Sequence, residues 1–132
     1  MSDHITPGLS FSQSRKITRE DTAARYGSGF LEVFATPAMI AFMEHTSLSA
    51  VQKYLERGFG TVGTYICVSH YRAVPVGKRV ECTATLTRID GNSLFFDVLV
   101  SDKEGKIGEG THTRYIIEEE RFMKKFLQEK EK

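Results

Sequence analysis

The sequence predicts an α+β domain in which one long central helix is wrapped by a curved antiparallel β-sheet. Residues 37–57 contain no internal glycine or proline and carry apolar side chains at helical spacing. From about residue 61 to residue 117, segments rich in β-branched residues alternate between apolar and polar side chains, and short turns separate them. Packing a curved sheet around a single helix is the simplest way for these elements to bury their apolar faces.

The first third of the chain is expected to hold a weak strand, an irregular connection and the start of the helix. Residues 11–17 have a weak strand pattern, and residues 18–35 contain a flexible, glycine-containing stretch. Thr36 is the expected N-cap of the helix, with Pro37 in its first turn and Gly58 at its C-terminal end. The apolar stripe of this helix is expected to consist of Ile40, Leu48, Val51 and Leu55.

Four consecutive antiparallel strands are expected to follow the helix as a meander. The strand patterns cover residues 62–72, 79–89, 94–101 and 107–117. The tail, residues 118–132, is expected to form a short helix with one apolar side. A sheet of this kind ends in open edges, which favours dimerisation, so we expect a homodimer.

Length and composition indicate one domain over residues 1–132, with residues 1–10 and about 124–132 flexible. The formal net charge of +1 provides no large basic field, so we expect neither nucleic acid nor a membrane as a partner. The N-terminal residues lack the pattern of a signal peptide, and no apolar run approaches the roughly 20 residues of a membrane span. A cytoplasmic location is therefore expected.

The two cysteines, Cys67 and Cys82, lie in strand-like segments and are expected to be small buried side chains rather than a disulfide. The sequence contains no C-x-x-C or H-x-x-x-H pair. We therefore expect no metal site.

Glu44 is the most informative residue of the helix. At 100° per residue it points within about 40° of the expected apolar stripe, where an unpaired carboxylate is costly. It could reach solvent from the edge of the stripe or pair with an arginine on a strand. Alternatively, it is a base or nucleophile held in a cleft beside the sheet.

His70 and Thr36 are weaker candidates when each is taken alone. His70 shares a strand face with Ile66 and Val68, a position where a histidine is more often a hydrogen-bonded core residue than a catalyst. Thr36 by itself is readily explained as a helix cap. Their combination with Glu44 is more informative, because the strand that carries His70 has to pack over the helix that carries the other two.

Several segments together resemble the fluoroacetyl-CoA thioesterase-like family of hotdog-fold enzymes. The resemblance covers about residues 30–122 and rests on the spacing Thr-x7-Glu-x25-His together with the segments around it. These segments are V-F-A-T-P-A-M-I-A-F-M-E at 33–44, V-G-T at 62–64, I-C-V-S-H at 66–70, T-R-I-D-G at 87–91 and I-G-E-G-T-H-T-R at 107–114.

The resemblance implies a hotdog fold, a homodimer with sites at the subunit interface, and hydrolysis of an acyl-CoA thioester without a metal or cofactor. Thr36, Glu44 and His70 match the catalytic trio of the family. The matching substrate-binding residues are Gly63 in the acyl pocket, Phe30 in the lid and Arg114 near the site entrance. Residues 26–29, Y-G-S-G, depart from the bulky apolar lid of the family, so a short or small acyl group is expected without special selectivity for fluoroacetyl-CoA.

Glu44 would attack the thioester or activate water, and the free N–H groups at the helix start and at Gly63 are plausible donors to the oxyanion. Arg72, Lys78, Arg79 and Arg114 are candidates to bind the phosphates of coenzyme A. The alternatives are a non-catalytic acyl-CoA-binding hotdog dimer and a hotdog acyl-CoA hydratase or dehydratase. The D-x-x-x-x-H pattern expected of the latter is absent at the helix start.

Overall fold

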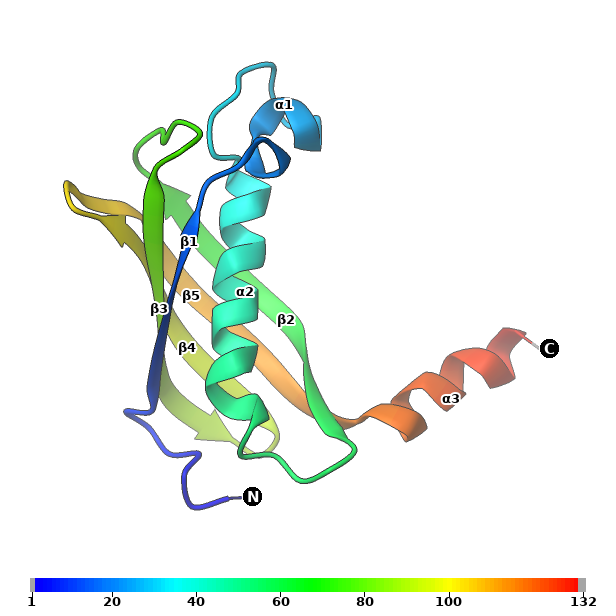
Figure 1. Ribbon diagram of the computed structural model, residues 1–132. Helices are drawn as coiled ribbons and strands as arrows, with labels where there is room; N and C mark the ends of the chain where they lie inside the picture. Colours follow the sequence, from blue (N-terminus) through cyan, green and yellow to red (C-terminus); the bar gives the residue numbers. More distant parts are fainter. Residues whose placement is uncertain (1, 131–132) are drawn as a thin grey trace.

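The structure, a computed structural model, describes residues 2–130 and the side chains of residues 2–127. A long helix lies against the concave face of a curved sheet, and a second helix projects from the C-terminal end (Figure 1). The elements are β1 (Ser10–Lys16), η1 (Arg19–Asp21), α1 (Ala23–Tyr26), α2 (Thr36–Gln52), β2 (Phe59–His70), β3 (Arg79–Asp90), β4 (Ser93–Asp102), β5 (Gly105–Glu118) and α3 (Glu119–Lys130). The predicted α+β class and the central helix are confirmed.

The five strands form one antiparallel sheet in the order β1-β3-β4-β5-β2. The meander expected for the four later strands is therefore wrong at its first step, because β2 pairs with β5 and not with β3. Residues 71–78 cross the end of the sheet instead of forming a hairpin, and the backbone N–H of Phe34 donates to the carbonyl of Val74 (2.8 Å) on this crossing. As a result, β2 is an edge strand.

Helix α2 begins one residue earlier and ends earlier than the sequence predicted. Its N-cap is Ala35, in an extended conformation, and Thr36 is already the first helical residue. Thr36 therefore does not act as the cap. The helix ends at Gln52, and Gly58, with φ of +90°, belongs to the turn that leads into β2.

The buried face of α2 differs from the predicted stripe by about one residue. Met39, Phe42 and Met43 are buried against the sheet, whereas Ile40 and Leu48 are only half-buried. The helix carries two adjacent apolar rows, and the sheet packs against the one with the larger side chains. Glu44 lies in the other row, on the flank of the helix that faces Gly63 of β2, and not in the middle of the core-facing stripe.

The two cysteines differ in their exposure, and the segment before β1 is anchored in the core. Cys82 is buried and Cys67 is exposed, so the expectation of two buried cysteines is wrong for Cys67, whose side chain lies on the outer face of the edge strand. Ile5 is buried, which anchors the segment before β1. The flexibility expected for residues 1–10 and 124–132 stays a prediction, and residues 1, 131 and 132 lie outside the described part of the chain. Within the described residues, no helix is long and apolar enough to cross a membrane.

Candidate functional site

Thr36 and His70 meet where α2 begins and β2 ends. The Thr36 hydroxyl lies 2.9 Å from Nδ1 of His70, and the edge of the Phe34 ring packs near the imidazole, with ring centroids 6.0 Å apart. A pocket of about 270 Å³ opens over this pair, and its lining includes Phe34, Thr36, His70 and Ala73. The sequence therefore predicted correctly that these two side chains come together.

The other ring nitrogen of His70 has no protein partner among the described residues. Nε2 is buried and makes no hydrogen bond there. Burial lowers the pKa of His70 below its ordinary value, which favours the neutral imidazole. A buried polar atom without a partner costs about 1–3 kcal/mol. Nε2 is consequently the atom of this pocket best suited to bind a substrate group or exchange a proton with it.

Glu44 lies two turns further along α2, about 12 Å of helix rise from Thr36. It is half-buried and packs on β2 at Gly63, where its Oε2 is 2.9 Å from the point that a Cβ of residue 63 would occupy. Only a glycine leaves room for the carboxylate at this position. Among the described residues Glu44 makes no hydrogen bond and no ion pair within 4.0 Å, so its oxygens are available for chemistry.

Arg114 lies beneath this carboxylate. It is 6% exposed, and it pairs in register with Gly63 across the β2–β5 ladder. Its Nε donates to Thr61 Oγ1 (2.7 Å) and its Nη2 to the Thr61 carbonyl (3.0 Å). Burial lowers the pKa of Arg114, while the negative charge of Glu44 raises it. Within the single chain Arg114 is thus a buried cation close to Glu44, and the role near the site entrance implied by the resemblance stays a prediction.

His112 was not assigned from the sequence, although it is part of the matched G-x-G-T-H-x-R segment. It is 1% exposed and lies on the same face of β5 as Arg114, two residues away. Its Nε2 is 3.1 Å from Nη1 of Arg114, and its Cε1 is 3.2 Å from the point that a Cβ of Gly63 would occupy. The period-two alternation of β5, applied from Arg114 back to His112, would have revealed it.

The candidate residues therefore form two groups within one chain. Thr36 and His70 form one, and Glu44, Gly63, Arg114 and His112 form the other. No hydrogen bond or ion pair between described residues links Glu44 to His70. Both groups face the side of α2 next to the edge strand β2.

Phe30 makes no contribution to either group within the chain. Its side chain is 98% exposed in the connection between α1 and α2, and the neighbouring Leu31 is 70% exposed. The glycine-containing connection predicted here is present, with Gly27 at φ of +73° ending α1, a short helix that the sequence pattern did not reveal. The lid role of Phe30 stays a prediction.

The candidate phosphate-binding residues are not equivalent. Arg72 is bound to Asp102 (2.5 Å) and Glu104 (3.3 Å), so its charge is already compensated. Arg114 is buried. Lys78 and Arg79 are exposed near the start of β3 and make no ion pair with another described residue.

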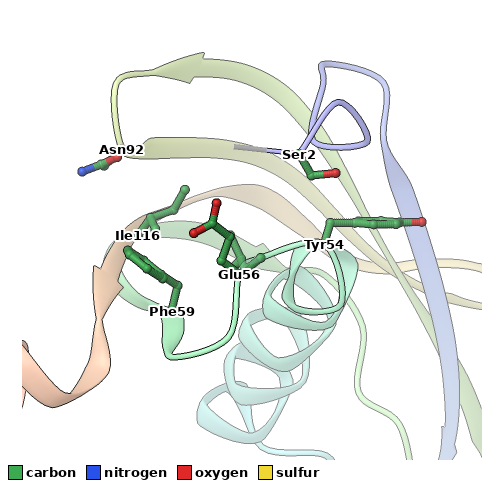
Figure 2. A pocket seen from close by; sticks show the side chains of 7 residues that line it. Ser2, Tyr54, Glu56, Phe59, Asn92 and Ile116 are labelled. Atoms are coloured by element: carbon green, nitrogen blue, oxygen red, sulfur yellow. The ribbon is translucent and has the colours of Figure 1, made fainter.

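A separate pocket of about 180 Å³ lies at the opposite end of α2 (Figure 2). Glu56 and Phe59 point into it from the turn and strand after the helix, and Ile116 and Asn92 line it from the sheet side. None of the catalytic or substrate-binding residues predicted from the sequence lines this pocket. The polar groups at the start of α2 and around Glu44 thus remain the candidate site.

A helix enclosed by a five-stranded antiparallel sheet, with a polar site between the helix and the edge strand, defines a hotdog-type thioesterase domain. The family model described as "Fluoroacetyl-CoA-specific thioesterase" matches residues 17–120. The chain belongs to this family.

Individual relatives support this family assignment. The fluoroacetyl-CoA thioesterase of Streptantibioticus cattleyicolor is 43% identical over 99 residues, which cover 75% of this chain and 71% of the relative. A solved structure of the fluoroacetyl-CoA thioesterase FlK has a TM-score of 0.89 at 36% identity and covers 96% of this chain and 98% of its own. A mutant of FlK in complex with fluoroacetate and CoA has a TM-score of 0.84 at 35% identity over 89% of this chain and 99% of its own.

Proposed function

We propose that this protein is an acyl-CoA thioesterase that hydrolyses a short or small acyl-CoA to the free acid and coenzyme A. The observation that carries the proposal is the unpaired Glu44 carboxylate, packed on Gly63 of β2, in a chain of this family. Glu44 makes no direct hydrogen bond or ion pair with a described residue, although the buried Arg114 cation lies close to it, and a pocket that only binds an apolar acyl group has no need of such a carboxylate.

The reaction joins an oxygen to the thioester carbonyl carbon and breaks its bond to sulfur, and the sulfur leaves as the thiol. Glu44 either attacks the carbonyl carbon, forming an anhydride that water then opens, or removes a proton from the attacking water. A neutral His70, with Nδ1 bonded to the Thr36 hydroxyl, has Nε2 available to transfer a proton. Backbone N–H groups near Gly63 and at the start of α2 are suited to stabilise the oxyanion.

A homodimer supports this chemistry better than a single chain. β2 is an edge strand, and Gly63 and Thr64 are exposed on it. Antiparallel pairing of β2 with its copy would place the C-terminal end of one β2 beside the N-terminal half of the other, bringing the partner subunit's His70 toward Glu44. It would also give the exposed Phe30 a surface to cover. Light scattering is expected to give twice the chain mass of 14.9 kDa, and a fully active monomer would contradict the shared site.

The acyl preference follows from the connection before Phe30. Gly27 and Gly29 replace bulky side chains there, and the segment packs little against the rest of the chain. We therefore expect modest selectivity among small acyl groups, since one methylene in an apolar pocket is worth about 1–3 kcal/mol. Comparing kcat/KM for fluoroacetyl-CoA and acetyl-CoA tests this, and a preference of several orders of magnitude for the fluorinated substrate would contradict it.

The decisive experiment is release of free thiol from a panel of acyl-CoA thioesters, from acetyl to medium chain. Activity should appear without added metal or cofactor and should survive EDTA. We place the enzyme in the cytoplasm, where acyl-CoA substrates are available. If no thioester in the panel is cleaved above the uncatalysed rate, the non-catalytic acyl-CoA-binding dimer becomes the better description.

A further inference from the structure

Strand β2 contains a β-bulge directly beside Glu44. Gly63 pairs with Arg114 and Tyr65 pairs with Thr113, so Thr64 is an extra residue on β2 that has no paired residue on β5. Such a residue is left out of the ladder and changes the direction of the backbone around it. The bulge therefore sets where the backbone N–H groups of this segment point, next to the residue on which the carboxylate packs.

His112 holds this bulge from inside the fold. Its Nδ1 lies 2.7 Å from the carbonyl oxygen of Tyr65, the first residue after the bulge. A carbonyl only accepts, so Nδ1 carries the proton. A guanidinium only donates, so Nε2 accepts from Nη1 of Arg114. Both ring nitrogens are occupied and the tautomer is fixed.

The environment excludes a proton-transfer role for His112. Its side chain is almost completely buried, and burial is the main reason that its pKa is lowered; the nearby Arg114 charge acts in the same direction, whereas the hydrogen bond to the Tyr65 carbonyl and the charge of Glu44 act in the opposite one. A second proton would have to sit on Nε2, facing the Nη1 donor of Arg114. The imidazole is thus a neutral, static part of the fold that joins β5 to the bulge.

We propose that His112 is a positioning residue: its Nδ1–H bond to the Tyr65 carbonyl holds the β2 bulge so that backbone N–H groups at Gly63 and Thr64 stay beside Glu44, aimed at the substrate carbonyl. The catalytic part of this inference rests on the proposed thioesterase function. Donors to a developing oxyanion work only within about 0.5 Å of the right place. On the outer side, the Thr64 hydroxyl donates to the Thr113 carbonyl (3.3 Å), so the bulge is held from both faces.

The wild-type protein provides the first test. Nitrogen-15 NMR of the histidine side chains should show His112 as the neutral Nδ1–H tautomer, with fast amide exchange at Gly63 and Thr64, whose N–H groups the proposal leaves free for the substrate. An Nε2–H tautomer, or a charged ring at neutral pH, would overturn the proposal. This result does not depend on any enzymatic activity.

A matched pair of variants provides the second test. The side-chain amide nitrogen of His112→Asn can occupy the Nδ1 position, whereas the side chain of His112→Gln reaches only the Nε2 position, toward Arg114. We expect His112→Asn to keep kcat within about 3-fold and His112→Gln to lower kcat by about 10- to 100-fold with KM little changed. The backbone amide chemical shifts of residues 63–66 should change only in His112→Gln.

Thermal unfolding of both variants separates positioning from general destabilisation. Equal loss of kcat in the two variants, or loss only in His112→Asn, would overturn the proposal and assign the effect to the contact with Arg114. If the wild-type protein hydrolyses no thioester while the tautomer and the exchange pattern are as expected, the proposed function fails and the structural role of His112 at the bulge stands.

Discussion

Replacing Gly63 with alanine tests most directly whether the position of the Glu44 carboxylate matters. The added Cβ would lie 2.9 Å from Oε2 of Glu44, 3.2 Å from Cε1 of His112 and 3.4 Å from Nη1 of Arg114. Gly63 has no positive φ, so the backbone accepts alanine without strain. The effect of Gly63→Ala therefore comes from crowding, which is most severe at the Glu44 carboxylate and smaller at His112 and Arg114.

Gly63→Ala should lower the stability of the fold only slightly but lower the catalytic rate strongly. The shortest contact is about 0.5 Å closer than van der Waals separation, and overpacking of this kind costs about 1–3 kcal/mol in a rigid core. Glu44 Oε2 is the end of a flexible side chain that can move away, so we expect the low end, about 1 kcal/mol or about 4 °C in Tm. Moving a catalytic oxygen by several tenths of an ångström should nevertheless lower kcat by about 10- to 100-fold.

Gly60→Ala is the matched control. Gly60 lies on the same strand, and its Cβ would meet Cδ of Glu119 at 3.3 Å, a milder crowding of another flexible glutamate far from His70. Thiol release from acetyl-CoA and thermal unfolding should be measured for both variants. If Gly63→Ala retains wild-type kcat, or if Gly60→Ala loses as much, the assignment of Glu44 to the reaction is refuted.

Three further predictions concern the same site. Glu44→Gln should remain folded by circular dichroism but lose about 100-fold or more in kcat, and near-normal turnover would remove Glu44 from the mechanism. Thr36→Ser should keep kcat within about 3-fold because it retains the hydroxyl that binds His70, whereas Thr36→Ala should lose about 10-fold; equal rates would show that the hydroxyl is dispensable. Burial lowers the pKa of His70 and of His112, so below the ordinary value of 6.5 the unfolded chain binds more protons than the folded one. The free energy of unfolding, measured with urea, should therefore fall as the pH is lowered through about 6.5, and an unchanged or rising value would contradict this sign.

Alternation along single strands was enough to predict most of the sheet. The segments around Val80, Val98 and Ile116 bury every second side chain, so their boundaries were predicted to within about two residues. The position of β2 could not be obtained in this way. Its residues pair with β5 across 38 residues at the near end (His70 with Gly108) and 59 at the far end (Phe59 with Glu118), and local alternation contains no information about which edge a strand joins.

The site was predicted in part because its residues belong to a specific spacing. Thr36 and His70 are in contact as expected, and Glu44 lies in the row of Ile40 and Leu48 as predicted. The error was to take this row for the core-facing one, since two apolar rows run side by side along α2 and only packing selects one of them. The assignment of His112 and the burial of Arg114 were not predicted, for a different reason. Charged and polar residues on a strand are ordinarily exposed, and their burial here depends on the small residue that faces them across the ladder.

Glycines on β2 and β5 connect the fold to both halves of the site. Gly108 pairs with His70, and a Cβ there would lie only 2.5 Å from Sδ of Met39, so its absence lets α2 approach this edge of the sheet. Met39 is in the first turn of the helix, one turn from Thr36, and this close approach brings the Thr36 hydroxyl to His70. Gly63 has the equivalent effect two turns later, where it admits the Glu44 carboxylate above Arg114. A bulky residue at either glycine would move the helix or its side chain away from the edge strand, so the spacing of the polar residues is functional only because small residues lie opposite them.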